Sequence, residues 1–545
     1  MHTFKHLAFV LCASIGVSGF AQKMPAIKQT SFKKDTVSIV KFGAVNDGVF
    51  LNTKSINDAI NQVNANGGGV VKIPRGFWLT GPIVLKSNVN LYLETDAFLQ
   101  FTNDFNQYKI IETNWEGLGA FRNESPIYAK NQTNIAITGG GIIDGWGEAW
   151  RFVKKGKLTE SQWKNKVASG GVVSDDKKSW YPSEKFAVGA KVKNAGVIAD
   201  GATYEKALAY KDFLRPNLIV LEKCSQILLE GVTFQNSAAW NVHPLMSDNI
   251  VIRKLKIKNP WYAQNGDGLD LESCSNVLVE DTYFDVGDDA ICIKSGRNEE
   301  GRKRAMPTQN VLVRNCVVYQ AHGGFVVGSE MSGGARNIHV ENCTFIGTDI
   351  GIRFKTTRGR GGIVENITLN NINMRDIPGE AILFDMYYEA VDPVPQNGEK
   401  RQPPKVEYKA VDETTPQFRN ISINNVVVSG AHKGIFLRGV PEMSVKNIKM
   451  ENITIQADQG IDCQEAENIS FKNVNIFATS KDAPVYILNS KNISFNGFNY
   501  NKTPLLMDIQ GGRSKNVTIN KADTKGAEKV FEAAYGADAK VITIK

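Results

Sequence analysis

One short phrase recurs through most of this chain and restricts what the chain can fold into. The phrase begins with Asn, continues with a β-branched or aliphatic residue, and then alternates apolar and polar residues. Its eleven copies begin at Asn134, Asn249, Asn276, Asn310, Asn337, Asn366, Asn420, Asn447, Asn468, Asn492 and Asn516. From Asn249 to Asn366, and again from Asn420 onward, the copies lie 21 to 34 residues apart with no helical periodicity between them. This pattern predicts an all-β chain folded as a right-handed parallel β-helix, one coil per copy, because a Greek-key sandwich would not keep one phrase at one interval.

The repeat accounts for two other features of the sequence. Most of the Asn-x-Ser/Thr sequences, which in isolation are typical of glycosylation sites, fall on the repeat asparagine. We expect this asparagine to hold a turn and to stack on its equivalents in neighbouring coils. Cys316 and Cys343 each follow a repeat asparagine by six residues, and Cys224 and Cys274 look similar. We expect small buried residues at these positions, with disulfide bonds as the alternative.

The chain begins with the features of a secretory signal. Residues 1–21 contain Lys5, an apolar run from Leu7 to Val17 and the small residues Gly19 and Ala21. This segment predicts cleavage before Gln22 and export to the periplasm or the medium, because the apolar run is too short to span a bilayer. Its removal deletes one lysine and no acid, so the net charge falls from +8 to +7. A mildly basic surface favours an anionic polymer as partner, although surface lysines alone would explain it equally well. We expect neither a membrane nor a nucleic acid as partner.

The remaining residues, 22–545, are expected to form one β-helix domain. Residues 53–63 predict a short amphipathic helix that caps the first coil and covers an edge that would otherwise pair with other chains. The repeat lapses twice, over about 150–212, where the sequence is rich in Lys and Trp, and over 389–417, where it contains PVPQNGEKRQPP. Both segments are expected to be insertions that project from the solenoid.

Aligning the strands that follow each phrase brings acidic residues together. The segments GDGLDLES, GDDAICIKS, HGGFVVGSE, DIGIRFKTT and GEAILFDMYY share two inward columns of apolar residues. Because side chains alternate between faces, Asp270, Cys292 and Arg353 are expected in one outward column. The next outward column is expected to contain Glu272, Lys294, Lys355 and Asp385.

The two acidic turns ahead of these strands then meet. Asp267 and Asp289 fall in a common position one coil apart, with Asp288 beside them, so three carboxylates should face one groove. His322 follows one coil later, and Arg353 and Lys355 one coil beyond that. A solvated polar face or a calcium site is the alternative. Like charges held this close force pKa values apart, which is what acid–base catalysis requires.

Four motifs in this order resemble those of glycoside hydrolase family 28, the polygalacturonases. The family motifs NTD, GDD, GHG and RIK correspond to NGD at 265–267, GDD at 287–289, AHGG at 321–324 and RFK at 353–355. The change from NTD to NGD lies outside the carboxylate. The segments IKSGRNEEGRKR and HGGFVVGSEMSGG further resemble the bacterial exo-acting enzymes of this family.

The resemblance implies hydrolysis of α-1,4-galacturonosidic linkages by a single displacement with inversion. Asp288 would be the general acid, Asp267 and Asp289 would activate water, and His322 would tune the acid or bind substrate. Each role falls to a proton-carrying or cationic side chain, so no metal and no cofactor is expected.

The resemblance also implies a set of substrate-binding residues. Arg353 and Lys355 would hold the uronate carboxylate, and Asn265 would contact sugar hydroxyls. Tyr387 or Tyr388 would add an aromatic face, and His243 either lines a further subsite or is a packed histidine. Lys294 would also bind substrate, and the basic residues Arg297 and Arg302 would supply charge to the terminal uronate at the non-reducing end.

The expected substrate is a pectic polysaccharide or oligogalacturonide, cleaved by a monomeric enzyme. An extra seven residues between the phrases at Asn276 and Asn310 fall in 295–309, beside the groove. Together with the two insertions, this loop would close one end of the groove and favour exo-action from the non-reducing end. A rhamnogalacturonan hydrolase of the same family, a calcium-dependent pectate lyase and a non-catalytic glycan-binding β-helix are the alternatives.

Overall fold

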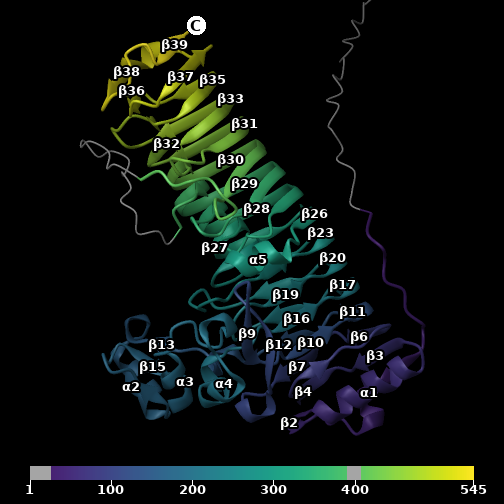
Figure 1. Cartoon of the computed structure of the whole chain (residues 1–545). Helices are drawn as coiled ribbons and strands as arrows, with labels where there is room; N and C mark the ends of the chain where they lie inside the picture. The colour runs from purple at the N-terminus through teal and green to yellow at the C-terminus, as the bar shows by residue number, and fades with distance from the viewer. Residues whose placement is uncertain (1–25, 389–406) are drawn as a thin grey trace, which may run out of the picture.

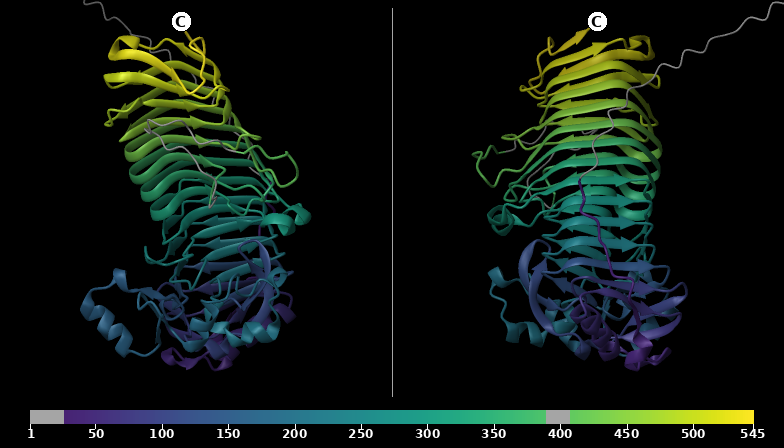
Figure 2. Two further views of the ribbon diagram at one scale, coloured as in Figure 1. Left: turned by 60° about the vertical axis from the view of Figure 1, so that its left-hand side comes forward. Right: turned by 90° about the vertical axis from the view of Figure 1, so that its right-hand side faces the viewer.

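The computed structural model describes residues 26–388 and 407–545 of the chain. The chain winds into a long solenoid, which rises from the N-terminal coils to the C-terminal coils (Figures 1 and 2). Thirty-four strands of the described residues form one sheet, and each coil pairs in parallel with the next. The predicted right-handed parallel β-helix is therefore confirmed. The predicted signal, residues 1–21, lies outside the described residues, as does part of the predicted insertion at 389–417.

Three short strands make each central coil. The first face contains β16 (Ile219–Glu222), β19 (Val242–Leu245), β22 (Leu269–Glu272) and β25 (Asp289–Lys294). The second contains β17 (Ser225–Glu230), β20 (Asp248–Arg253), β23 (Ser275–Glu280) and β26 (Thr308–Arg314). The third contains β18 (Thr233–Gln235), β21 (Lys256–Lys258) and β24 (Tyr283–Asp285). The turn between the third face and the first carries the acidic motifs.

Later coils contain longer strands that bend around the corners. These are β27 (Val317–Val327), β28 (Ala335–Lys355), β29 (Ile363–Asp385), β30 (Gln417–Arg438), β31 (Val445–Ala457), β32 (Gln459–Gln464) and β33 (Ala466–Ala478). The solenoid ends with β34 (Val485–Leu488), β35 (Lys491–Tyr500), β36 (Thr503–Gln510), β37 (Lys515–Asn520), η7 (Thr524–Gly526), β38 (Ala527–Ala534) and β39 (Ile542–Ile544).

A helix closes the other end of the solenoid. Helix α1 (Thr53–Ala65) turns Ile56, Ala59, Ile60 and Val63 into the core of the first coil, which confirms the predicted cap. The coils beside it contain η1 (Ile39–Phe42) and the strands β1 (Thr36–Ser38), β2 (Asp47–Leu51), β3 (Gly69–Ile73), β4 (Gly76–Thr80), β5 (Ile83–Val84), β6 (Val89–Leu93), β7 (Ala97–Phe101), β10 (Ile127–Lys130), β11 (Thr133–Gly139) and β12 (Ile142–Asp144). Among the helices of the described residues, none is long and apolar enough to cross a membrane.

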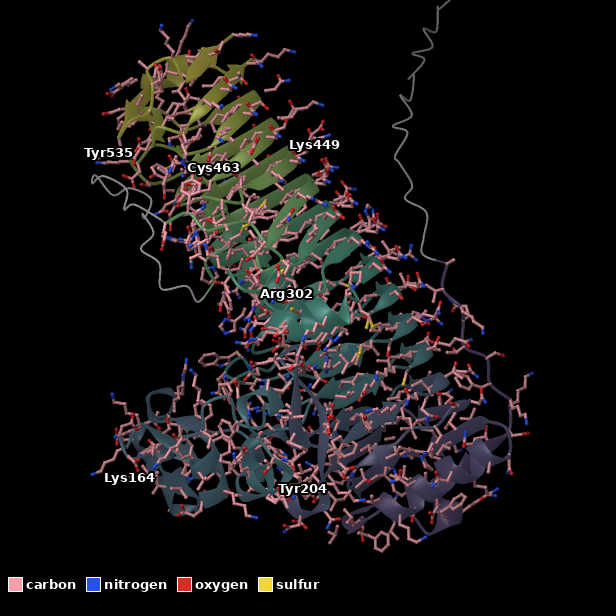
Figure 3. The ribbon with its side chains drawn as sticks, viewed as in Figure 1. Lys164, Tyr204, Arg302, Lys449, Cys463 and Tyr535 are labelled. Atoms are coloured by element: carbon pink, nitrogen blue, oxygen red, sulfur yellow. The ribbon has the colours of Figure 1, made fainter. Side chains whose placement is uncertain are left out.

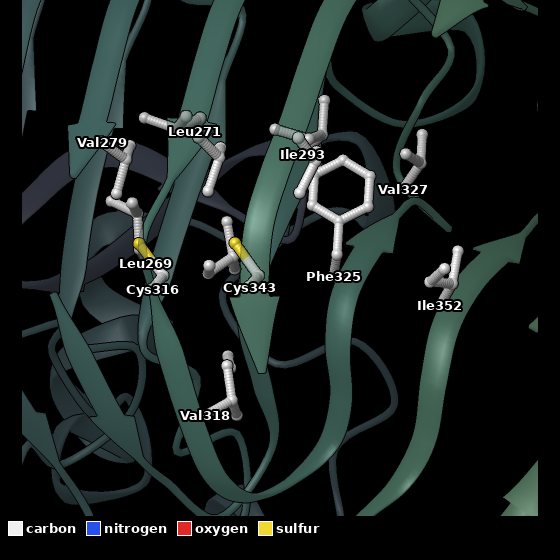
Figure 4. Packing of buried hydrophobic residues seen from close by; sticks show 14 of the residues in the cluster. Leu269, Leu271, Val279, Ile293, Cys316, Val318, Phe325, Val327, Cys343 and Ile352 are labelled. Atoms are coloured by element: carbon white, nitrogen blue, oxygen red, sulfur yellow. The ribbon is translucent and has the colours of Figure 1, made fainter. Parts of the chain in front are cut away.

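The core consists of apolar columns that run along the solenoid. Leu269 is in register with Ile291, Ile291 with Phe325, and Phe325 with Ile352, as the period-two pattern predicts. Figure 4 shows Leu269, Phe325 and Ile352 directed into the interior, together with Cys316 and Cys343. All six cysteines after residue 21 are buried and free, as expected for Cys224, Cys274, Cys316 and Cys343. They are Cys224, Cys274, Cys292, Cys316, Cys343 and Cys463.

The repeat asparagines hold the corners of the coils. Asn468 has a φ of 57°, a left-handed conformation that asparagine tolerates better than most residues. Its Nδ2 donates to Oδ1 of Asn447 at 3.1 Å, and its Oδ1 accepts from Asn492 at 2.8 Å. The ladder continues from Asn492 to Asn516 and from Asn447 to Asn420. These side chains form a stack across coils, as predicted.

Three segments leave the solenoid near the acidic turns. The hairpin of β8 (Ile110–Trp115) and β9 (Leu118–Asn123), which the sequence analysis did not predict, follows η2 (Phe105–Gln107). The predicted insertion at 150–212 projects sideways from the N-terminal coils (Figure 1). It follows η3 (Gly147–Ala149) and contains β13 (Val153–Lys154), η4 (Lys155–Lys157), α2 (Glu160–Ala168), β14 (Val172–Val173), β15 (Ser179–Tyr181), α3 (Glu184–Gly189), η5 (Ile198–Asp200) and α4 (Tyr204–Ala209), and it ends in η6 (Lys211–Phe213). The extra residues after β25 form helix α5 (Asn298–Arg304).

The N-terminal described segment crosses the coils. The backbone N–H of Lys28 donates to Oδ1 of Asn249, and that of Ser31 donates to Oδ1 of Asn134. Nε2 of Gln226 donates to the carbonyl oxygen of Gln29. This segment, which we call the strap (residues 27–31), therefore runs along the outside of the coils, as the purple trace in Figure 2 shows.

Candidate active site

Three carboxylates meet at the turns before β22 and β25. One oxygen each from Asp267, Asp288 and Asp289 lies within 4.8 Å of the others. The register of the coils explains why these carboxylates lie close together, because the backbone N–H of Gly268 donates a hydrogen bond to the carbonyl oxygen of Asp289 in the next coil. Asp267 is only 3% exposed and Asp289 only 1%, whereas Asp288 is half-buried. Asp288 is therefore the member of this acidic cluster that reaches solvent.

Burial and mutual repulsion separate the three pKa values. Burial, with the charges of Asp270 and Asp288, raises the pKa of Asp267 well above its ordinary value. Burial and the charge of Asp289 raise the pKa of Asp288. Burial alone would also raise the pKa of Asp289, but Lys355 and Arg353 outweigh it and lower that pKa. The cluster therefore combines an ionised carboxylate with carboxyls that keep a proton to higher pH.

Two basic residues of the RFK motif lie against Asp289. Nζ of Lys355 donates to Oδ2 of Asp289 at 2.7 Å, and Nη1 of Arg353 lies 3.5 Å from its Oδ1. Both reach Asp289 from β28, whose Arg353 is in register with Val326 of the coil before. Lys355 is buried, so its role differs from the predicted contact with a substrate carboxylate: it neutralises Asp289 from beneath the groove. Arg353 remains partly exposed.

Asp288 opens onto a depression of about 730 Å³, which we call the catalytic groove. His322 lies on its wall, one coil after Asp288, with Nδ1 at 3.2 Å from Oδ2 of Asp349. This exposed position agrees with the prediction that His322 borders the acid. The groove is also lined by residues that the sequence analysis missed. These are Trp261 and Tyr262, both exposed, and Lys154 and Lys157 from the insertion.

Lys294 and His243 are buried and do not line the groove, which corrects the prediction that Lys294 binds substrate and agrees with the packed alternative for His243. Lys294 is 4% exposed; its Nζ donates to Oε2 of Glu330 at 3.0 Å and lies 3.6 Å from Oδ1 of Asp270. His243 is 1% exposed, with Nε2 at 3.0 Å from Oε2 of Glu272. The outward columns were correctly aligned, but packed segments cover them here, so their charged groups pair with one another.

Arg302 and Tyr387 also require correction. Nη1 of Arg302 donates to the carbonyl oxygens of Gly359 and Arg360, so this residue attaches α5 to the neighbouring loop. Figure 3 shows it on α5, midway along the solenoid. Tyr387 is buried in the core. The next residue, Tyr388, is the aromatic neighbour of the site, because its ring lies 5.1 Å from Nζ of Lys355 and 5.7 Å from Cζ of Arg353.

Asn265 and Arg297 lie where the groove meets the segments that leave the solenoid. Oδ1 of Asn265 accepts from Nη2 of Arg215 at 2.8 Å, and the residue lines the groove. Nη1 of Arg297 lies 3.3 Å from Oε2 of Glu116, at the tip of the β8–β9 hairpin. Both predicted residues are thus beside the catalytic turns, in contact with partners that no short motif marks.

The acidic cluster has two possible chemistries. Three carboxylates this close could hold a hard cation such as Ca²⁺. However, Lys355 and Arg353 already supply positive charge to Asp289, and Lys294 lies beside Asp270. The cluster is also tighter than the ~6.5–9.5 Å that separates the two carboxyls of most inverting glycosidases, so distance alone does not determine the stereochemistry. A half-buried carboxyl that lines the groove, beside two buried ones, suits general acid–base catalysis.

Comparison with known proteins agrees with this geometry. The chain is 29% identical to a probable polygalacturonase of Vitis vinifera over 435 residues, which cover 78% of this chain and 75% of the relative. It is 26% identical to an exo-poly-alpha-D-galacturonosidase of Dickeya chrysanthemi over 479 residues, covering 85% of this chain and 74% of the relative. Among solved structures, an exopolygalacturonase from Thermotoga maritima is 29% identical with a TM-score of 0.65, covering 83% of this chain and 93% of its own.

A family model matches the part of the chain that carries the site. The model of the glycosyl hydrolases family 28 covers residues 159–433, about half of the sequence, including all four catalytic turns. The chain therefore belongs to glycosyl hydrolases family 28.

Proposed function

We propose that this glycoside hydrolase cleaves α-1,4-galacturonosidic linkages of polygalacturonate and releases galacturonate units from the non-reducing end. The observation that carries the proposal is the acidic cluster, in which only Asp288 faces the groove while Lys355 keeps Asp289 ionised. The names of the relatives, which include exo-acting polygalacturonases, support the substrate class. We further propose that the enzyme is exported and acts as a monomer on pectic polymers.

In the proposed reaction, Asp288 gives its proton to the glycosidic oxygen as the bond to the anomeric carbon breaks. Its raised pKa keeps that proton available, and its half-buried position gives it access to the linkage. A water molecule attacks the anomeric carbon from the opposite face and passes its proton to Asp289, with Asp267 orienting the water. His322 lies close enough to lower the pKa of Asp288 and so adjusts its acidity.

Exo-action is favoured by the segments at the N-terminal side of the groove. The hairpin tip contacts the start of α5, because the backbone N–H of Arg297 donates to the carbonyl oxygen of Gly117 and that of Gly119 donates to Glu300. A Cβ at Gly117 would lie 2.6 Å from the backbone nitrogen of Arg297, so the two segments are in tight contact. A groove closed in this way accepts a chain end more readily than the middle of a chain.

The product profile tests this proposal. With polygalacturonate we expect mono- or digalacturonate from the first time point and a slow loss of viscosity. An early ladder of mixed oligomers with a rapid fall in viscosity would instead show an open groove and internal cleavage. If the enzyme hydrolyses rhamnogalacturonan but not polygalacturonate, it is a rhamnogalacturonan hydrolase.

A chelator tests the expected independence from metal ions. We expect full activity after treatment with EDTA, because Lys355 and Arg353 already provide the positive charge that a cation would bring. Loss of activity that calcium restores, together with unsaturated products that absorb in the ultraviolet, would identify a lyase instead.

A further inference from the structure

A second cavity adjoins the catalytic groove on its N-terminal side. Its volume is about 220 Å³, and Asn265 lines both it and the groove. Its walls come from the β8–β9 hairpin, from the end of the insertion and from Arg297, the residue that precedes α5. We call it the arginine pocket, because three of its four charged lining residues are Arg122, Arg215 and Arg297.

The pocket holds more positive charge than its own residues neutralise. Its one carboxylate, Glu116, pairs with Arg297. Arg122 is buried, stacks over the ring of Trp115 at 3.5 Å and donates from Nη2 to the carbonyl oxygen of Arg215. Among the described residues, Nε of Arg122 and Nε of Arg297 have no hydrogen-bond partner. Buried cations with unused donors are costly, and an anion that fills the pocket would remove that cost.

The guanidinium of Arg215 adds to the free-energy cost of burying positive charge in the pocket. Burial lowers the pKa of Arg215 to about 10, with the charge of nearby Arg151 as a second cause. Burial and the charge of Arg215 likewise lower the pKa of Arg122. Arg215 is fixed in place, since its guanidinium donates to the carbonyl oxygens of Ala238 and Gln264 and to Oδ1 of Asn265. The positive charge is therefore held rigidly beside a residue of the groove.

The size of the pocket limits its ligand. At about 220 Å³ it is smaller than the ~300–1,000 Å³ of sites for drug-sized molecules, and it suits one monosaccharide. The contact between Gly117 and Arg297 fixes the hairpin wall of the pocket against the start of the α5 segment.

We propose that the arginine pocket binds the carboxylate of a single uronate, the terminal residue of the substrate, while the linkage to the next residue lies at Asp288. This inference rests on the proposed galacturonosidase activity and identifies the residues that select a charged chain end. It predicts that free galacturonate is a ligand in its own right and that galactose, which lacks the carboxylate, is not.

Calorimetric titration of the full enzyme with D-galacturonate and D-galactose tests the proposal, using Arg297→Gln and the control Lys303→Gln. Arg297 is 27% exposed and precedes α5, so its replacement should spare the fold, whereas Lys303 faces solvent on the same helix and pairs with Glu299. We expect galacturonate to bind the parent and Lys303→Gln equally. Arg297→Gln should bind it about tenfold or more weakly, because a charge-assisted hydrogen bond is lost.

If the parent binds galactose as tightly as galacturonate, or if Arg297→Gln binds galacturonate as tightly as the parent, the proposed uronate-binding role of the arginine pocket is wrong. Hydrolysis of polygalacturonate, assayed separately, distinguishes this failure from failure of the proposed function. An enzyme that cleaves polygalacturonate but binds galacturonate without Arg297 has the activity and lacks the pocket. If the enzyme binds galacturonate through Arg297 but cleaves no galacturonosidic linkage, the uronate-binding pocket is correct and the proposed activity is wrong. Circular dichroism confirms that both variants are folded.

Discussion

Replacing Asp288 by Asn should lower kcat by about 10²–10⁴-fold while leaving the fold intact, since a positioned general acid contributes an effect of this size. Asp288 lies on a turn at the edge of the groove, and the apolar columns of the core do not depend on its charge. The activity of the parent should fall as pH rises through the raised pKa of Asp288, because the acid must be protonated. The residual activity of Asp288→Asn should not show this fall in activity at alkaline pH.

Asp285→Asn is the matched control, because it makes the same change on β24 of the same coil, outside the groove. It should retain the activity and the pH profile of the parent. The anomeric configuration of the product, followed by NMR, tests the other half of the mechanism. Substantial turnover by Asp288→Asn over the whole pH range would remove Asp288 from the role of acid, and a retained configuration would exclude direct attack by water.

Replacing Asp267 by Asn should lower activity by about 10²–10⁴-fold and yet stabilise the protein at neutral pH. The folded-state pKa of Asp267 is raised, mainly by burial and by Asp270 and Asp288. Its protonated form therefore contributes stability that is fully present below the unfolded-state pKa, near 3.8, and is lost as pH rises through the folded-state pKa. The amide carries no charge and avoids this loss.

The thermal unfolding midpoint, measured between pH 3 and pH 8, checks this sign. We expect Asp267→Asn to unfold at a higher temperature than the parent near pH 7, with the difference vanishing below about pH 4. Asp482→Asn, the same substitution at an exposed position on a distant coil, should follow the parent throughout. A variant that is less stable than the parent at neutral pH would mean that the ionised carboxylate is stabilised by its surroundings.

The solenoid and the acidic cluster could be predicted because both follow from register. Alternation fixes which side chains face inward, and a repeated phrase fixes how coils align, so Asp267 and Asp289 meet whatever else the chain contains. What covers a coil does not follow from either pattern. Lys294 was correctly assigned to an outward column, but the ring of Trp240 lies over it, 4.7 Å from its Nζ, and also packs against the ring of His243 at 4.9 Å.

The arginine pocket was unpredictable for the same reason. Arg122, Arg215 and Arg297 come from three segments that are far apart in sequence and carry no common motif. The hairpin that contributes Arg122 has strands of ordinary length, and its contact with α5 is a tertiary contact that no sequence pattern marks. A signal was available for Trp261 and Tyr262, since two adjacent aromatic residues after Pro260 directly precede the NGD turn.

The strap changes how the solenoid would come apart under tension. Most coils are bonded only to the coils before and after them, so the C-terminal coils can peel away one at a time. Residues 27–31 instead bond the coils of Asn134, Gln226 and Asn249 through one segment of chain, and Ile27 packs beside Val251, Leu278 and Leu312. The coils under this tie resist peeling together, so a chain pulled from its C-terminal end would lose its distal coils before it reaches the coils that the strap ties, which adjoin the acidic turns.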